Sequence, residues 1–302
     1  MVVAASAGRN PPQHAPNFPA AGSISASTAL SVVVAALAAI QAVLGLTMSG
    51  QYRDTDLLRA GWFGNDWITL VVAVPVLLGA LALARRGSPR ARLVWLGMLG
   101  YLAYNDAFYL FGAALNTFFP IYVVLLVLTV VTLATALTQL DVAATCQAFS
   151  PRTPARGVGG YLVVLGTGLC AVWFVFWAGH VFAGATLPVG AEAFRVVAAL
   201  DLTVLVPVLL GGGTLLWRRR PWGYVLGAAA GVMGTGYLLV LATGSLIAVV
   251  RGLADAPGEL PLWGSLAVST AVATALLLAR PQRRVTSILG SPRTTDGQQE
   301  PT

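Results

Sequence analysis

The sequence contains no lysine, and it is poor in charge, cysteine and histidine. All 18 basic residues are arginines, and only 10% of the 302 residues are charged. Without lysine the chain cannot form a Schiff base with retinal or pyridoxal phosphate, and it cannot bind a nucleotide phosphate through a P-loop lysine. Two cysteines, Cys146 and Cys170, and two histidines, His14 and His180, are too few for a structural zinc site, an iron-sulfur cluster or multihaem ligation. We therefore expect neither a metal nor a cofactor, and no disulfide.

What the sequence has in excess is apolar side chains. Hydrophobic residues make up 57% of the chain and the mean hydropathy is +0.78, whereas a soluble domain carries about 25% charged residues. The composition predicts an all-α, multi-pass protein of the bacterial cell membrane. A span requires about 20 mainly apolar residues, and arginine clusters and Pro/Gly turns divide the chain into eight predicted spans: 27–48, 66–84, 93–114, 118–140, 160–184, 194–217, 222–250 and 262–280.

The arginines are distributed unevenly between the two predicted sides. Fourteen of the 18 fall on one side, and only Arg53, Arg59, Arg195 and Arg251 fall on the other. By the positive-inside rule both termini are predicted to be cytoplasmic. The arginine clusters are better explained by topology and by contacts with anionic membrane lipids than by nucleic-acid binding.

Parts of the sequence recur. Residues 69–86 align without gaps on residues 201–218 and share the run PVLLG at Pro75 and Pro207. Two further short matches, Gly100 with Gly236 and Ala134 with Ala273, follow in the same order at offsets of 136 and 139 residues, against 132 for the first. This pattern predicts a parallel internal repeat of four helices. The predicted parts are a disordered tail 1–26, a first membrane unit 27–140, a cytoplasmic linker 141–159, a second membrane unit 160–280 and a disordered tail 281–302.

Ionisable side chains within spans are costly, so each one is a candidate for function. Asp106 lies in the third predicted span and Asp201 in the sixth, both about 10 Å from the outer surface by helical rise. Gln41 reaches a similar depth, His180 is expected near the outer interface, and Asp66 is expected to open the second span. An apolar setting would keep the Asp106 carboxyl protonated and able to act as an acid. The alternative is that Asp106 and Asp201 only hydrogen-bond neighbouring helices.

Polar and aromatic residues accompany Asp106 along its predicted helix. Helical spacing places several of them on one stripe that would line a cavity for a lipophilic small molecule. The predicted substrate-binding residues are Tyr101, Tyr104, Asn105, Phe108, Tyr109 and Asn116, together with Gln41 and Asp66. The predicted catalytic residues are Asp106 as the acid, with Asp201 or His180 as the proton acceptor.

One stretch of the chain resembles a known group of proteins. The runs Tyr52–Asp54, Gly64–Leu70, Arg85–Arg90 and Tyr104–Asn116 are similar to a family of uncharacterised bacterial polytopic membrane proteins, over residues 50–125. The resemblance implies a membrane scaffold and no particular activity. Asp106 departs from the family pattern, in which an aromatic residue usually follows the asparagine.

Three functions fit these features. An acidic residue among aromatic rings resembles the chemistry of small integral-membrane terpene cyclases, which act on isoprenoids and need no cofactor. This cyclase chemistry is the predicted function; the alternative is a proton-coupled transporter, which paired prolines, a glycine-rich seventh span and buried acids would suit. Small-residue faces such as Gly227 and Gly231 would suit a non-enzymatic membrane subunit.

Overall fold

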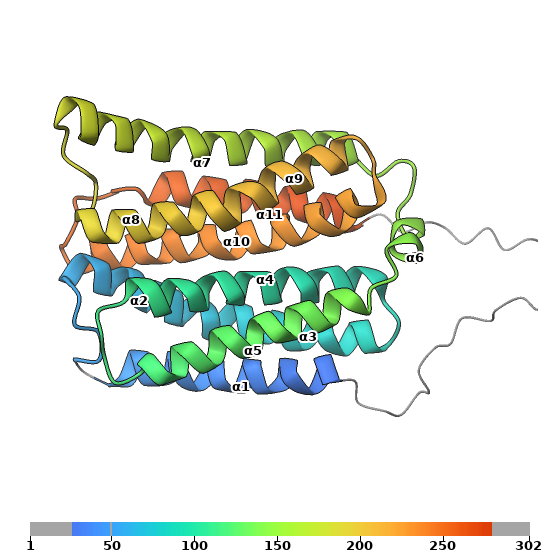
Figure 1. The fold of residues 1–302 in the computed structure, drawn as a ribbon, viewed down its shortest axis with the longest axis horizontal. Coiled ribbons are helices and arrows are strands. Elements are labelled where there is room, and N and C mark those ends of the chain that lie inside the picture. The colour runs from blue at the N-terminus through green and yellow to red at the C-terminus, as the bar shows by residue number, and fades with distance from the viewer. Residues whose placement is uncertain (1–25, 49, 280–302) are drawn as a thin grey trace, which may run out of the picture.

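The computed structural model describes residues 26–48 and 50–279, and throughout these the chain is helical with no β-strand. The predicted tails 1–26 and 281–302 lie outside the described residues, apart from Ala26. The helices run nearly parallel to one another in an up-and-down bundle (Figure 1). Their bounds are α1 (Ala26–Thr47), α2 (Asp56–Ile68), η1 (Thr69–Ala73), α3 (Val74–Arg85), α4 (Pro89–Gly112), α5 (Phe119–Thr138), α6 (Val142–Gln147), α7 (Ala155–Ala183), α8 (Ala191–Leu200), η2 (Asp201–Leu205), α9 (Val206–Trp217), α10 (Pro221–Val250) and α11 (Leu260–Ala279).

Within the described part of the chain, seven helices are long and apolar enough to cross a membrane. They are α1, the continuous helix Asp56–Arg85, α5, α7, the continuous helix Ala191–Trp217, α10 and α11. This confirms the multi-pass helical architecture. The remaining predicted span corresponds to α4, which has 24 residues but is less apolar because Asn105, Asp106 and several tyrosines interrupt it.

The predicted boundary of the second span was wrong. The prediction began that span at Asp66, whereas α2 begins at Asp56 and continues without a break into η1 and α3. The sequence from Asp56 to Asn65 carries charges that resemble a loop, yet Ala60, Trp62 and Gly64 on it are buried. Their burial against neighbouring helices explains why the chain is helical here. Asp66 therefore lies about 15 Å inside the helix rather than at its start.

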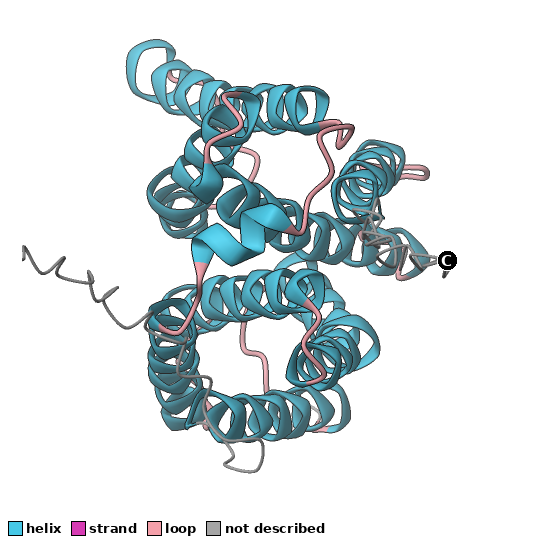
Figure 2. Ribbon diagram, turned by 90° about the vertical axis from the view of Figure 1, so that its right-hand side faces the viewer, coloured by secondary structure: helices cyan, strands magenta, loops and turns pink. Residues whose placement is uncertain are grey.

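The helices form two groups that meet along α10. Helices α1 to α5 pack around one another, and the second group consists of α7, α10, α11 and the continuous helix formed by α8, η2 and α9. Figure 2 shows the two groups end-on, with the short helix α6 across their junction. Helix α10 belongs to the second group but also packs against α2 and α4 of the first. At this crossing a Cβ on Gly64 would lie 2.7 Å from the backbone nitrogen of Gly244, so glycine permits the close approach.

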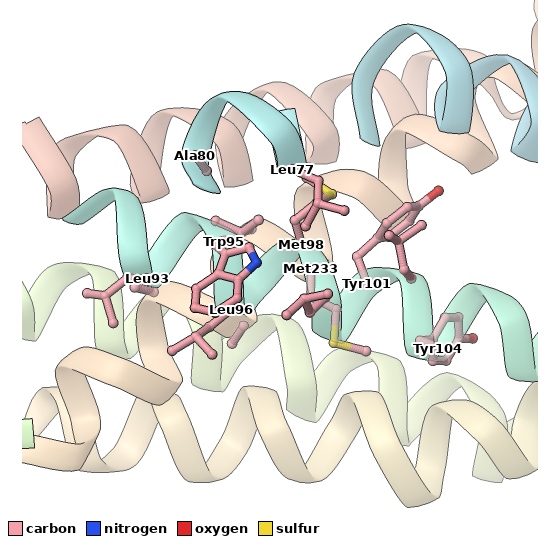
Figure 3. Close-up of a cluster of buried hydrophobic side chains, with 14 of the residues drawn as sticks. Leu77, Ala80, Leu93, Trp95, Leu96, Met98, Tyr101, Tyr104 and Met233 are labelled. Atoms are coloured by element: carbon pink, nitrogen blue, oxygen red, sulfur yellow. The ribbon is translucent and has the colours of Figure 1, made fainter. Parts of the chain in front are cut away.

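The core between α3, α4 and α10 is apolar and tightly filled. Leu77 of α3, Leu96 and Leu99 of α4 are almost completely buried, and Met233 of α10 joins them. Figure 3 shows Leu77 and Ala80 facing the side chains of α4, with Met233 beside them. Since lipid tails are as apolar as these side chains, close packing stabilises the fold here through dispersion contacts, and not through removal of apolar surface from water.

Two π-helical segments occur at matching places in the two groups. One residue separates η1 from Pro75 and η2 from Pro207. In η1 the backbone N–H of Val74 donates to the carbonyl oxygen of Thr69, five positions earlier. In η2 the backbone N–H of Val206 donates to the carbonyl oxygen of Asp201 in the same way. Pro75 and Pro207 have no N–H, and their rings clash with the preceding turn of a regular α-helix. Local widening to a π-helix accommodates each proline, and such segments often mark functional sites.

Both ends of the described chain lie at the end of the bundle that carries α6 (Figure 1). We call this the α6 end and the opposite end the far end. The helix bounds place Arg53, Arg59, Arg195 and Arg251 at the far end, and all other described arginines at the α6 end. This is the partition on which the predicted topology rests.

Candidate functional site

Three acidic residues are buried inside the bundle, and each has a different environment. Asp66 is fully buried on α2 and accepts hydrogen bonds from three side chains. The hydroxyl of Tyr52 donates to Oδ2 at 2.7 Å, and the hydroxyl of Tyr109 donates to Oδ1 at 2.8 Å. Gln41 Nε2 donates to Oδ1 at 3.2 Å. These donors come from α1, the loop before α2, and α4, so Asp66 joins three segments of the first group.

Aromatic rings surround the phenols that bind Asp66. Tyr109 stacks on Trp62 with ring centroids 5.0 Å apart and on Tyr122 at 5.2 Å. Tyr52 stacks on Trp62 at 6.1 Å. Trp62 is buried in this cluster, and its indole N–H donates to Asp54 at 3.0 Å. The rings pack against both phenols that donate to Asp66.

Tyr52 lies in the loop before α2, and its hydroxyl is buried. Burial raises the pKa of Tyr52 above its usual value, and the nearby Asp66 carboxyl raises it further. The hydroxyl therefore keeps its proton throughout the physiological range. It remains a hydrogen-bond donor to Asp66.

Asp201 is fully buried at the first residue of η2 and also has three donors. The hydroxyl of Tyr104 donates to Oδ1 at 2.5 Å. Trp173 Nε1 donates to Oδ2 at 2.8 Å, and the hydroxyl of Tyr237 donates to Oδ2 at 3.2 Å. Tyr104 belongs to α4 in the first group, whereas Trp173 and Tyr237 belong to α7 and α10 in the second. The Asp201 carboxylate therefore ties the two groups together.

Asp106 has a simpler setting. It is buried on α4, and Thr129 of α5 donates a hydrogen bond to its Oδ2 at 2.9 Å. The structure does not gather the predicted aromatic residues around it: Tyr104 binds Asp201, and Tyr109 binds Asp66. Successive helical residues are rotated by about 100°, so residues close in sequence on α4 face different neighbours.

The other predicted residues are placed as follows. Gln41 joins Asp66, and Phe108 packs against Trp62 with ring centroids 4.7 Å apart. Tyr101 and Asn105 are buried on α4. Asn116 lies beyond the end of α4, where it accepts a hydrogen bond from Gln51 at 2.8 Å, so it does not belong to the predicted helical stripe.

His180 is exposed near the end of α7, and its Nδ1 lies 2.9 Å from the carbonyl oxygen of Ala185. It contributes nothing to the Asp201 site, whose α7 partner is Trp173. The sequence reasoning missed Tyr52, Trp173 and Tyr237 as site residues. Tyr237 could have been found from the repeat, since it follows Gly236 as Tyr101 follows Gly100.

The two carboxyl clusters lie at the same depth. Asp66 is ten residues from the start of α2 (56 to 66), and Asp201 is ten residues from the start of α8 (191 to 201). At 1.5 Å per residue each lies about 15 Å from the far end. Among the described residues, no three His, Cys, Asp or Glu side chains gather into a group that could bind a metal ion. The clusters are thus built from carboxyl, phenol, indole and amide groups.

No protein-family model, curated protein or solved structure matches this chain. Conclusions about function therefore depend on the geometry of the buried acidic residues.

Proposed function

We propose that this chain is a proton-coupled transporter of a small molecule, in which Asp201 carries the coupling proton. The observation that supports the proposal is the set of donors on Asp201, which come from both groups of helices. An ionisable residue within a membrane is costly and commonly belongs to a substrate or proton pathway.

The proposed topology has eight spans in two units of four, with both termini in the cytoplasm. Helix α4 is the eighth span: its 24 residues extend about 36 Å, enough to cross the hydrocarbon core. The matching π-helices before Pro75 and Pro207 support an internal duplication. Parallel repeats of this kind build several transporter folds, with the sites between the repeats.

The protonation state of Asp201 would alter the contact between the two groups. When ionised, the carboxylate accepts charge-assisted hydrogen bonds from all three donors, and such bonds are about twice as strong as neutral ones. When protonated, its bond with Tyr104 weakens, and so does the link between α4 and the second group. Proton binding would thereby shift the balance between two arrangements of the groups.

The test compares a strain lacking the gene with strains that carry the wild type, Asp201→Asn or Asp255→Asn. Asp255 is exposed in the loop after α10 and is the matched control. Untargeted mass spectrometry of cells and medium should find a compound of unchanged mass whose distribution shifts in the deletion strain. The wild type and the control should restore it, and Asp201→Asn should not.

The flux itself is then measured with purified protein in liposomes that contain a pH-sensitive dye. Addition of the compound should change the internal pH with the wild type and not with Asp201→Asn. Full restoration by Asp201→Asn, or no shift of any compound, would refute the proposal.

A second candidate is an acid-initiated cyclase acting on a lipophilic isoprenoid substrate. The observation that favours it is the aromatic shell of Tyr52, Trp62, Tyr109 and Tyr122 near the Asp66 carboxyl. Aromatic faces stabilise carbocations, and a neutral carboxylic acid can protonate an alkene. Because cyclisation preserves mass, the substrate and the product of such an enzyme are isomers. If this function is correct, Asp66→Asn cells should lose the product and accumulate the substrate of equal mass.

A further inference from the structure

A pocket of about 580 Å³ opens at the far end, where the two groups of helices meet. Three segments supply its walls: the start of α2, the end of α4 with the following loop, and the start of α8 with the preceding loop. The ends of these helices lie together in Figure 1. The lining residues are 54, 55, 57, 58, 111–115 and 189–196. Its size is in the range of binding sites for small molecules.

Most of the pocket wall is apolar. Leu57, Phe111 and Leu115 line it, and these side chains are 49%, 60% and 73% exposed. Val189 and Val196 contribute from the second group. A ligand would therefore cover apolar surface that is otherwise open at this end of the bundle, which favours binding of a molecule with an apolar portion.

Two charged side chains of opposite sign line the same pocket. Glu192 and Arg195 lie on the first turns of α8, three residues apart and thus on one face of the helix. Neither forms a hydrogen bond or an ion pair with another described residue; the salt bridge found in the described chain joins Arg59 and Asp56. The pocket thus offers one anion and one cation that are both available to a ligand.

The other acid of the pocket, Asp54, already accepts hydrogen bonds. Its carboxylate accepts hydrogen bonds from Trp62 Nε1 at 3.0 Å and from the backbone nitrogen of Ala114 at 3.1 Å. It therefore shapes the wall instead of contributing a free charge. Trp62 also stacks on Tyr109, which binds Asp66, so packed side chains connect the pocket to the Asp66 cluster.

We propose that this pocket binds a zwitterionic molecule with an apolar portion. The ligand's ammonium group would contact Glu192, its anionic group would contact Arg195, and its apolar portion would lie against Phe111 and Leu115. This deepens the transporter proposal and rests on it, because the pocket would receive the substrate on the far side. The same chemistry occurs in a free solute, such as a dipeptide of apolar residues, and in a phosphatidylethanolamine headgroup.

The free-solute source is tested with radiolabelled Leu-Leu dipeptide on the purified full chain in detergent free of zwitterionic lipid. Equilibrium binding should be saturable and weaken at least about tenfold in Glu192→Gln and in Arg195→Gln. Arg195→Lys should retain most of the affinity. Arg53→Gln is the matched control, because Arg53 is exposed at the same end but does not line the pocket.

Two modified dipeptides identify which charge meets which residue. Acetylation of the ammonium should weaken binding to the wild type but have no further effect in Glu192→Gln. Amidation of the carboxylate should have no further effect in Arg195→Gln. These variants change exposed side chains, and unchanged melting temperatures would verify that they are folded.

The lipid source is tested by native mass spectrometry of protein released from phosphatidylethanolamine nanodiscs. Retention of that lipid by the wild type, with loss in Glu192→Gln, assigns the pocket to the headgroup. The proposal is wrong if neither the dipeptide nor phosphatidylethanolamine binds to the wild type. It is also wrong if Glu192→Gln and Arg195→Gln leave the binding unchanged. Binding without any proton-coupled flux would support the pocket and refute the transporter function, so the two failures can be told apart.

Discussion

The two groups of helices have the same local backbone at η1 and η2 but different chemistry there. The alignment at offset 132 places Thr69 opposite Asp201, and the shared Gly-Tyr pair places Tyr101 opposite Tyr237. In the second group Tyr237 donates to Asp201. In the first group the hydroxyls of Thr69 and Tyr101 are both buried and lie near each other, but neither meets hydrogen-bond geometry with a described residue, and no carboxyl accepts from them.

This difference indicates where each group places its acid. In the first group the acid next to the π-helix is Asp66, one turn before Thr69, and its three hydrogen-bond donors all belong to the first group. The second group has its carboxyl inside the π-helix and shares it with Tyr104 of the first group. Asp201 is therefore hydrogen-bonded to both groups of helices, whereas Asp66 is hydrogen-bonded within one group. For this reason we assign the coupling role to Asp201.

The largest expected effect is that of Asp201→Leu. Removal of the carboxylate leaves the buried Tyr104 hydroxyl and the partly buried Trp173 and Tyr237 donors without an acceptor, and each unsatisfied buried donor costs about 1–3 kcal/mol. We expect a loss of at least about 3 kcal/mol and a large fall in melting temperature, measured by circular dichroism in detergent. The matching change Thr69→Val should cost less than about 1 kcal/mol, because that hydroxyl has no partner. Equal losses would contradict the comparison.

The paired tyrosines should respond in opposite directions. Tyr237→Phe removes one of three donors to Asp201 and should destabilise the protein by about 1–2 kcal/mol. Tyr101→Phe removes a buried hydroxyl that has no hydrogen-bond partner, and it should be neutral or stabilising by up to about 1 kcal/mol. Thermal unfolding of the two variants side by side measures this. A destabilised Tyr101→Phe variant would show that the two groups are more alike than the contacts indicate.

Stability at alkaline pH should depend on Tyr52. Its pKa in the folded protein is raised above the ordinary value of 10.0, so folding favours the protonated phenol. The contribution of the Tyr52 phenol to the free energy of unfolding is therefore complete below pH 10. Above pH 10 this contribution falls by up to about 1.4 kcal/mol per pH unit. Melting temperatures between pH 9 and 11 should therefore decline more steeply for the wild type than for Tyr52→Phe. Parallel declines would refute a role for Tyr52.

The smallest effect is expected at Asp106. Its contact in the described chain is the hydrogen bond from Thr129, and the side-chain oxygen of asparagine can accept the same bond. Asp106→Asn should change stability by less than about 1 kcal/mol and leave transport intact. Loss of transport in this variant, in the cell assay used for Asp201→Asn, would move the coupling proton to Asp106.

Much of the fold could be predicted from the order of apolar runs. The predicted spans end within a few residues of α1, α5, α7, α10 and α11. The error at Asp66 has a physical cause: the segment Asp56–Asn65 contains charged residues that read as a loop, and only its burial against neighbouring helices makes it a helical extension. Sequence hydropathy cannot detect such burial, because it treats every residue as facing the same solvent.

The sequence predicted most of the polar residues of the candidate site but not which of them lie together. Asp106, Asp201, Gln41, Tyr104 and Tyr109 were recognised as polar residues inside spans, because membrane insertion makes such residues exceptional, whereas Asp66 was placed at the start of a span. Their grouping was not recognised. The prediction collected the tyrosines around Asp106, whereas helix rotation sends Tyr104 toward Asp201 and Tyr109 toward Asp66.

The sequence by itself determined that this is a multi-pass helical protein and that Asp106 and Asp201 lie within helical spans, because hydropathy and proline position act through local contacts and solvent. Only the tertiary structure decided which phenol meets which carboxyl and that Asp201 joins the two groups. Those pairings bring together residues up to 97 positions apart, as with Tyr104 and Asp201. They depend on how whole helices rotate and pack, which no short stretch of sequence specifies.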